Sequence, residues 1–187
     1  MATSLVRPTA SVRSSYLAAI AEYRAEGGYP DFDDLEVSDP AAFHAYVEQL
    51  CRDPRSAPAP DWPTMTLLWW IDGLEYLGRL SVWHALTGPS ADSGHIGYDI
   101  RPSARGRGHA TAMLAAALPT VAALGINPVV ATVRARNVAS RRVLEAAGAR
   151  LVKMDGDRLY FQLSTGERQS DRSPSTTPAG STGAPQS

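Results

Sequence analysis

The feature that most constrains the fold is one continuous stretch, GHIGYDIRPSARGRGHATAML (residues 94–114). Its spacing predicts a strand up to Ile100 and an amphipathic helix from Ala110 onward, with an Arg/Gly turn between them. A helix N-terminus offers unpaired amides and the positive end of a dipole, and Gly106 and Gly108 let a phosphate approach the backbone closely. The stretch therefore predicts a strand, turn and helix that bind a phosphate-bearing group.

Basic residues gather around this turn. Residues 101–150 carry eight Arg and one acid, although the 187-residue chain has a net charge of -1. This part of the chain is therefore suited to anions. It contains no aromatic residue that could stack on bases, and the sequence pI is about 6.4. Both observations argue against a nucleic-acid partner.

The remaining composition excludes other classes of protein. A single cysteine, Cys51, cannot form a disulfide framework, and four scattered histidines show no metal-ligand spacing, so we expect no metal. No apolar run approaches the ~20 residues of a membrane span, and residues 1–15 lack the apolar core of a secretory signal. The sequence predicts a cytoplasmic protein with no membrane association.

The chain divides into three segments. Residues 1–60 are expected to form a helical arm that belongs to the main domain. The arm has a break at Gly27-Gly28 and a second helix that starts at Asp39-Pro40. Residues 61–163 predict the core of the domain. Residues 164–187 are mostly Ser, Thr, Pro and Gly with no large apolar residue, which predicts a disordered tail.

The core has the pattern of an α/β or α+β layered fold, a mixed and mostly antiparallel sheet with helices on both faces. A hairpin with an Asp72-Gly73 turn comes first, and Pro119 is expected to kink the first helix of the core. The predicted strands are residues 65–71, 74–83, 95–100, 128–133, 149–154 and 157–163, and the predicted helices are residues 110–124 and 137–147.

Two common phosphate motifs do not fit the turn. A Walker loop requires Lys-Ser/Thr after the glycines, and a dinucleotide fingerprint requires a third glycine where Thr111 stands. The sequence instead resembles the GNAT superfamily of N-acetyltransferases, in a branch of predicted acetyltransferases. The segment Arg105 to Ala110 matches the family's Arg/Gln-x-x-Gly-x-Gly/Ala signature, and NVASRRVLEAAGARLV (residues 137–152) matches its later Asn-x-x-Ser segment.

The resemblance implies a sheet splayed open after the third predicted strand, with acetyl-CoA as cosubstrate in the wedge. Backbone groups of Tyr98 and Ile100 are then expected to pair with pantetheine. The residues expected to hold the phosphates are Arg105, Gly106, Arg107, Gly108, His109 and Ala110, and those expected to line the far side of the cofactor are Asn137, Ser140 and Arg142.

The implied reaction is acetyl transfer to a primary amine of a small molecule or peptide, by direct attack in a ternary complex. We expect His84, or His95 together with Asp99, to relay the amine proton. Many members of the family place an acid Tyr where Leu144 stands, so Tyr98 or Tyr160 replaces it or no dedicated acid exists.

Alternatives remain open. A protein that binds acyl-CoA without turnover, as a sensor or accessory subunit, is the alternative function. A homodimer also fits the resemblance. Acidic residues in YPDFDDLEVSD (residues 29–39) and TGPSADSG (residues 87–94) favour a cationic acceptor.

Overall fold

The computed structural model describes residues 2–27, 36–52 and 63–165. The proposed tail, most of the acidic segment 29–39 and most of the Pro/Ala-rich segment 56–63 lie outside these residues. The helices are α1 (Arg13–Glu26), α3 (Pro40–Cys51), α4 (His109–Ala123) and α5 (Val138–Ala146), with 3-10 turns η1 (Ala10–Val12), η2 (Gly88–Ser90) and η3 (Pro102–Ala104). The strands are β1 (Thr3–Val6), β2 (Met65–Asp72), β3 (Glu75–Trp83), β4 (Ile96–Ile100), β5 (Val129–Arg134), β6 (Arg150–Asp155) and β7 (Arg158–Leu163).

Local signals set the ends of the N-terminal helices. Gly27 ends α1 in the left-handed conformation, with φ of 65°, where glycine has no steric penalty. Asp39 caps α3 by accepting a hydrogen bond at 3.1 Å from the amide of Ala41, and Pro40 occupies the first turn. Both ends agree with the sequence prediction.

The strands form two antiparallel sheets, ordered β1-β2-β3-β4 and β5-β7-β6. Strand β1 was not predicted, because four residues are too few to show alternation. The hairpin turn is also shifted: Asp72 pairs with Glu75, so the turn residues are Gly73 and Leu74. Gly73 has φ of 59°, as the first position of a II′ turn requires.

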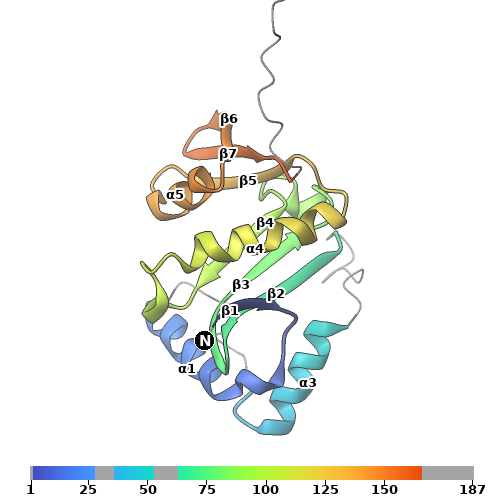
Figure 1. The fold of residues 1–187 in the computed structure, drawn as a ribbon, viewed down its shortest axis with the longest axis vertical. Coiled ribbons are helices and arrows are strands. Elements are labelled where there is room, and N and C mark those ends of the chain that lie inside the picture. Colours follow the sequence, from blue (N-terminus) through green and yellow to red (C-terminus); the bar gives the residue numbers. More distant parts are fainter. Residues whose placement is uncertain (1, 28–35, 53–62, 166–187) are drawn as a thin grey trace, which may run out of the picture.

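Helices cover both faces of the β1–β4 sheet, with α4 on one side and α1 and α3 on the other (Figure 1). Trp69 and Trp70 are adjacent in β2 and are both buried, but they pack into the two different cores. This alternation makes both tryptophans core residues. The α/β class, the splayed sheet and helices on both faces are confirmed.

Backbone hydrogen bonds join the two sheets near the start of β4. Gly94 forms an isolated bridge with Ala131, and the His95 amide donates to the Val130 carbonyl at 2.7 Å. Beyond this point β4 continues beside β3, whereas β5 continues beside β7. Among the described residues, no helix is long and apolar enough to cross a membrane.

Candidate functional site

One edge of β4 faces the splay between the sheets. On the other edge, the Trp83 amide donates to the His95 carbonyl at 2.7 Å and the Arg101 amide donates to the Leu77 carbonyl at 2.9 Å. Antiparallel pairing alternates, so the intervening even-numbered residues, including Tyr98 and Ile100, direct their backbone groups away from β3. This edge can pair with an extended ligand.

A pocket of about 640 Å³ opens at this edge, within the size range of ligand sites in proteins. It joins the end of β4 to the start of α4 and to α5. Its lining includes these predicted site residues: Tyr98, Asp99, Ile100, Arg105, Gly106, Gly108, His109, Ala110, Asn137, Ser140 and Arg142. A second pocket of about 470 Å³ between β4 and β5 shares Tyr98, Asn137 and Ser140.

The phosphate turn, which we define as residues 101–108, leads from β4 into α4. Gly106 and Gly108 have φ of 74° and 81°, a region that favours glycine, and a Cβ at either would meet no atom within 4 Å. The first hydrogen bond of α4 runs from the Ala112 amide to the Gly108 carbonyl at 3.1 Å. The amides of residues 109–111 therefore lack carbonyl partners within the helix, as in an anion site.

The arginines of the turn differ in what they contact. The Arg105 guanidinium forms an ion pair at 2.7 Å with Glu26 of α1 and donates from Nε to the Ile100 carbonyl at 2.9 Å. These two contacts orient the Arg105 side chain, and Arg105 also lines the first pocket. Arg107 is exposed and does not line either pocket, whereas Arg142 lines the first.

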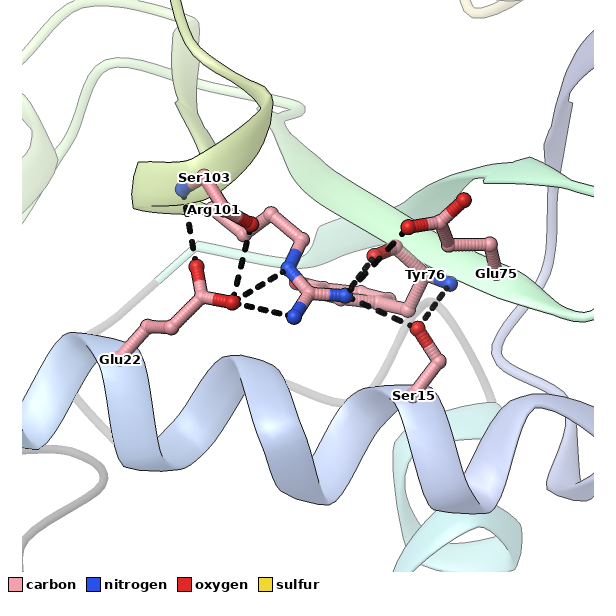
Figure 2. A network of polar contacts seen from close by, with 6 residues as sticks. All are labelled: Ser15, Glu22, Glu75, Tyr76, Arg101 and Ser103. Carbon is pink, nitrogen blue, oxygen red and sulfur yellow. Dashed lines mark hydrogen bonds and ion pairs between the residues drawn. The ribbon is translucent and has the colours of Figure 1, made fainter.

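A second basic residue, Arg101, is almost fully buried behind the turn (Figure 2). It forms an ion pair with Glu22 of α1, and Nη1 donates to the Ser15 hydroxyl at 3.0 Å. Glu22 also accepts from the amide and the hydroxyl of Ser103, each at 2.9 Å. The hydrogen bond from Arg101 is the main reason that the pKa of Glu22 falls to about 2.

Asp99 lies on the opposite face of β4 from the Tyr98 side chain. Its carboxylate accepts from the Tyr23 hydroxyl at 2.5 Å and from Arg79 Nε at 2.8 Å. Asp99 is the only acid among the described residues that line the two large pockets. The structure therefore holds one carboxylate, in a fixed orientation, at the free edge of β4.

Tyr98 reaches across the splay. Its hydroxyl donates to the Ser140 carbonyl of α5 at 3.3 Å, and burial raises its pKa above the usual value. Leu144, one helical turn beyond Ser140, is buried and lines the second pocket. The Tyr98 hydroxyl thus lies next to the part of α5 where the family's acid was expected.

The structure does not bring the two histidines into this site. His84 Nε2 lies 2.8 Å from the Thr66 hydroxyl, and His95 Nδ1 accepts from the Val130 amide at 3.0 Å. His95 precedes Asp99 by four strand residues, or about 13 Å. At this separation His95 and Asp99 form no direct relay, and the His95 ring joins the two sheets instead.

Sequence reasoning missed several contributors. The pocket lining also includes Ala104, Thr111, Ala139 and Val143, which carry no chemical signal. Tyr23, Glu22, Glu26 and Arg79 support the site from α1 and β3. Glu22 and Glu26 are four residues apart, the spacing of one helix face, but their partners lie 79 residues away in the sequence. Cys51 is half-buried at the end of α3.

Comparisons with known proteins agree with this geometry. No curated protein sequence matches the chain. Among solved structures, N-acetyltransferase PseH of Campylobacter jejuni in complex with acetyl coenzyme A has a TM-score of 0.53 at 13% identity, covering 88% of this chain and 100% of that one. The yncA protein of Salmonella typhimurium, with its cofactor acetyl-CoA, has a TM-score of 0.53 at 15% identity, covering 90% and 97%.

A third similar structure is a Salmonella typhimurium acetyltransferase that modifies the N-terminal serine of ribosomal protein L7/L12. It has a TM-score of 0.51 at 18% identity, covering 86% of this chain and 91% of that one. At these identities the likeness shows the fold. A family model described as an acetyltransferase (GNAT) domain matches residues 14–150, which is most of the described chain. The chain therefore belongs to the GNAT acetyltransferase family.

Proposed function

We propose that the protein is an acetyl-CoA-dependent N-acetyltransferase that acetylates a primary amine of a small molecule or peptide. One observation carries the proposal: the turn at Gly106 and Gly108 and the free backbone edge of β4 open into the same pocket. The turn suits a pyrophosphate, and the edge suits the amide-containing pantetheine arm. Asn137, Ser140 and Arg142 form the opposite wall.

The residues present fit acetyl-CoA, which supplies an electrophilic thioester carbonyl. The Tyr98 amide faces the splay, where it can donate to the oxyanion that develops on that carbonyl. An alkyl amine has a pKa of about 10 and must lose a proton before it attacks. We assign Asp99 to orient the amine and accept this proton, since Asp99 is the only acid among the described residues that line the pocket.

The leaving thiolate needs less assistance, because a thiol has a pKa of about 8.5. We assign Tyr98 as the acid that protonates it. Burial keeps this hydroxyl protonated, and its hydrogen bond to Ser140 is long at 3.3 Å and therefore weak. The alternative function is an acyl-CoA-binding protein without turnover. It is favoured by Leu144, which cannot act as an acid and stands where the acid of the family was expected.

Binding of acetyl-CoA is the first test. Ligand at 100 times its Kd should stabilise the fold by about 2.7 kcal/mol and raise the Tm by roughly 5 to 10 °C. The variant Gly108→Glu should keep a cooperative melt and lose this response, because a carboxylate would occupy the phosphate position. Gly148→Glu is the matched control, since Gly148 also has a positive φ and open space around its Cβ.

Both variants carry the strain of a non-glycine residue at positive φ, so only the response to ligand should differ. A Gly108→Glu variant that binds acetyl-CoA like the wild type would remove the assignment of the pocket. Release of free thiol from acetyl-CoA with a panel of primary amines then separates an enzyme from a protein that only binds. A panel that includes polyamines and basic peptides also tests the expected cationic acceptor.

A further inference from the structure

The acidic residues at the end of α1 lie where a helix disfavours them. Glu22 and Glu26 fall in the last two turns, beside the negative end of the helix dipole. Both reach toward the phosphate turn rather than into solvent. Their placement needs compensating partners, and the structure provides two arginines.

The Glu22 carboxylate binds the start of the phosphate turn at several points. It accepts from Arg101, from the Ser103 amide and from the Ser103 hydroxyl (Figure 2). Arg101 in turn donates to Ser15 and to the Tyr76 carbonyl. One carboxylate therefore fixes both backbone and side chains of residues 101–103 against α1.

Glu26 acts on the next part of the turn through Arg105. The guanidinium contacts Glu26 with Nη1 and the Ile100 carbonyl with Nε, which closes a link from α1 to the last residue of β4. The Arg105 amide donates to the Pro102 carbonyl at 3.2 Å. Arg105 is thus bound on both sides before Gly106 and Gly108 begin the phosphate cradle.

We propose that Glu22 and Glu26 are positioning residues that hold the phosphate turn in its binding conformation, with Arg105 acting as a brace rather than as a phosphate ligand. The inference rests on the proposed function, because it concerns the turn assigned to acetyl-CoA. It places part of the acetyl-CoA affinity in α1, which lies outside the pocket lining.

The Glu22–Arg101 and Glu26–Arg105 contacts should contribute unequally to acetyl-CoA binding. The Arg101 side chain is 8% exposed and that of Glu22 is 25% exposed, whereas Arg105 and Glu26 are 41% and 39% exposed. Loss of the Glu22 charge leaves the buried Arg101 with only a longer ion pair, at 3.8 Å, to the exposed Glu75, so Glu22→Gln should weaken acetyl-CoA binding about 10-fold or more. Loss of Glu26 breaks a solvated pair, so Glu26→Gln should weaken binding about 2- to 5-fold.

The deciding experiment is a double-mutant cycle on acetyl-CoA affinity, measured by calorimetry, with Glu26→Gln, Arg105→Gln and the double variant. If Arg105 is a brace, both single variants weaken binding and the double variant is no weaker than Arg105→Gln. If Arg105 is a phosphate ligand, Glu26→Gln frees it, and binding tightens or stays unchanged. That second result would overturn the proposal.

A ligand-free readout separates this inference from the proposed function. In the free protein, Glu22→Gln should speed amide hydrogen exchange of residues 103–105, whose amides are hydrogen-bonded in the turn, and leave the β2–β3 hairpin unchanged. Glu48→Gln is the control, because Glu48 pairs at the surface with His44 on α3. Unchanged exchange at the turn would refute positioning. A wild-type protein that binds no acetyl-CoA would instead refute the proposed function.

Binding of S-acetylpantetheine gives a final check, since this compound has no phosphate group. Glu22→Gln and Glu26→Gln should leave its affinity unchanged if they act only through the phosphate turn. Equal losses for S-acetylpantetheine and acetyl-CoA would mean that the substitutions damage the whole pocket. That outcome would also count against a positioning role at the turn.

Discussion

Tyr98 shows how a single residue can serve the proposed site in two ways. Its backbone faces the splay because of its register with Leu80 on β3, and its hydroxyl crosses to Ser140 on α5. Substitution of the side chain should therefore affect chemistry while leaving the backbone contacts intact.

Tyr98→Phe should lower kcat about 10-fold or more by removing the acid, with little change in the KM for acetyl-CoA. Tyr160→Phe is the control, because Tyr160 lies on β7 beneath Lys153 and lines neither large pocket. Steady-state kinetics of both variants provide the measurement. A normal kcat for Tyr98→Phe would mean that the thiolate leaves without this acid.

At the scale of elements, α1 connects the N-terminal segment to the site. Its buried face packs Tyr16, Ile20 and Tyr23 against the sheet, while Glu22 and Glu26 meet the phosphate turn. The low pKa of Glu22 has a consequence for stability. The ion pair between Glu22 and Arg101 contributes fully to the free energy of unfolding only while the Glu22 carboxyl is ionised in the folded protein.

The pKa of Glu22 is lowered from 4.5 to about 2 in the folded protein, so unfolding favours proton uptake. The stabilisation is complete above pH 4.5 and is lost as the pH falls from 4.5 toward 2. Glu22→Gln should therefore lower the free energy of unfolding at pH 7 and flatten its pH dependence in that window. Denaturant unfolding at several pH values tests this, with Glu48→Gln as control.

Element types were predictable because local physics determines them. The caps at Asp39 and Gly27 and the break of period after Ile100 each leave a short-range signal. The turn at Gly106 and Gly108 was predicted from its glycines and the helix that follows, whereas the pocket residues on α5 were reached only through the family resemblance. The contacts of Arg105 with Glu26 and of His95 with Val130 were not predicted, because they form through tertiary packing that leaves no local sequence pattern.

At the scale of the whole molecule, the two sheets depend on a small junction at Gly94 and His95. A Cβ at Gly94 would lie 2.7 Å from the Val130 carbonyl, so the close approach requires glycine. The His95 backbone and ring then take up both the carbonyl and the amide of Val130. This junction sets where the splay begins.

His95→Ala should destabilise the protein rather than impair catalysis. It leaves the half-buried Val130 amide unpaired, which costs about 1 to 2 kcal/mol and lowers the Tm by roughly 2 to 8 °C. Burial lowers the pKa of His95, so its contribution is present above about pH 6.5 and declines below it. Thermal melts and kcat should be compared with His44→Ala, an exposed histidine on α3. A stable variant with a much lower kcat would restore His95 to the reaction.

The alternation of β4 also limits how a chain of this kind can vary in length. Ile96 and Ile100 face the core under α4, and Asp99 faces Tyr23 and Arg79. One residue inserted or deleted within β4 would exchange these faces, placing a carboxylate in the core and an isoleucine in the polar cluster. It would also turn the free backbone groups toward β3 and remove the edge offered to a ligand. Changes of length are therefore intolerable within the five residues of β4.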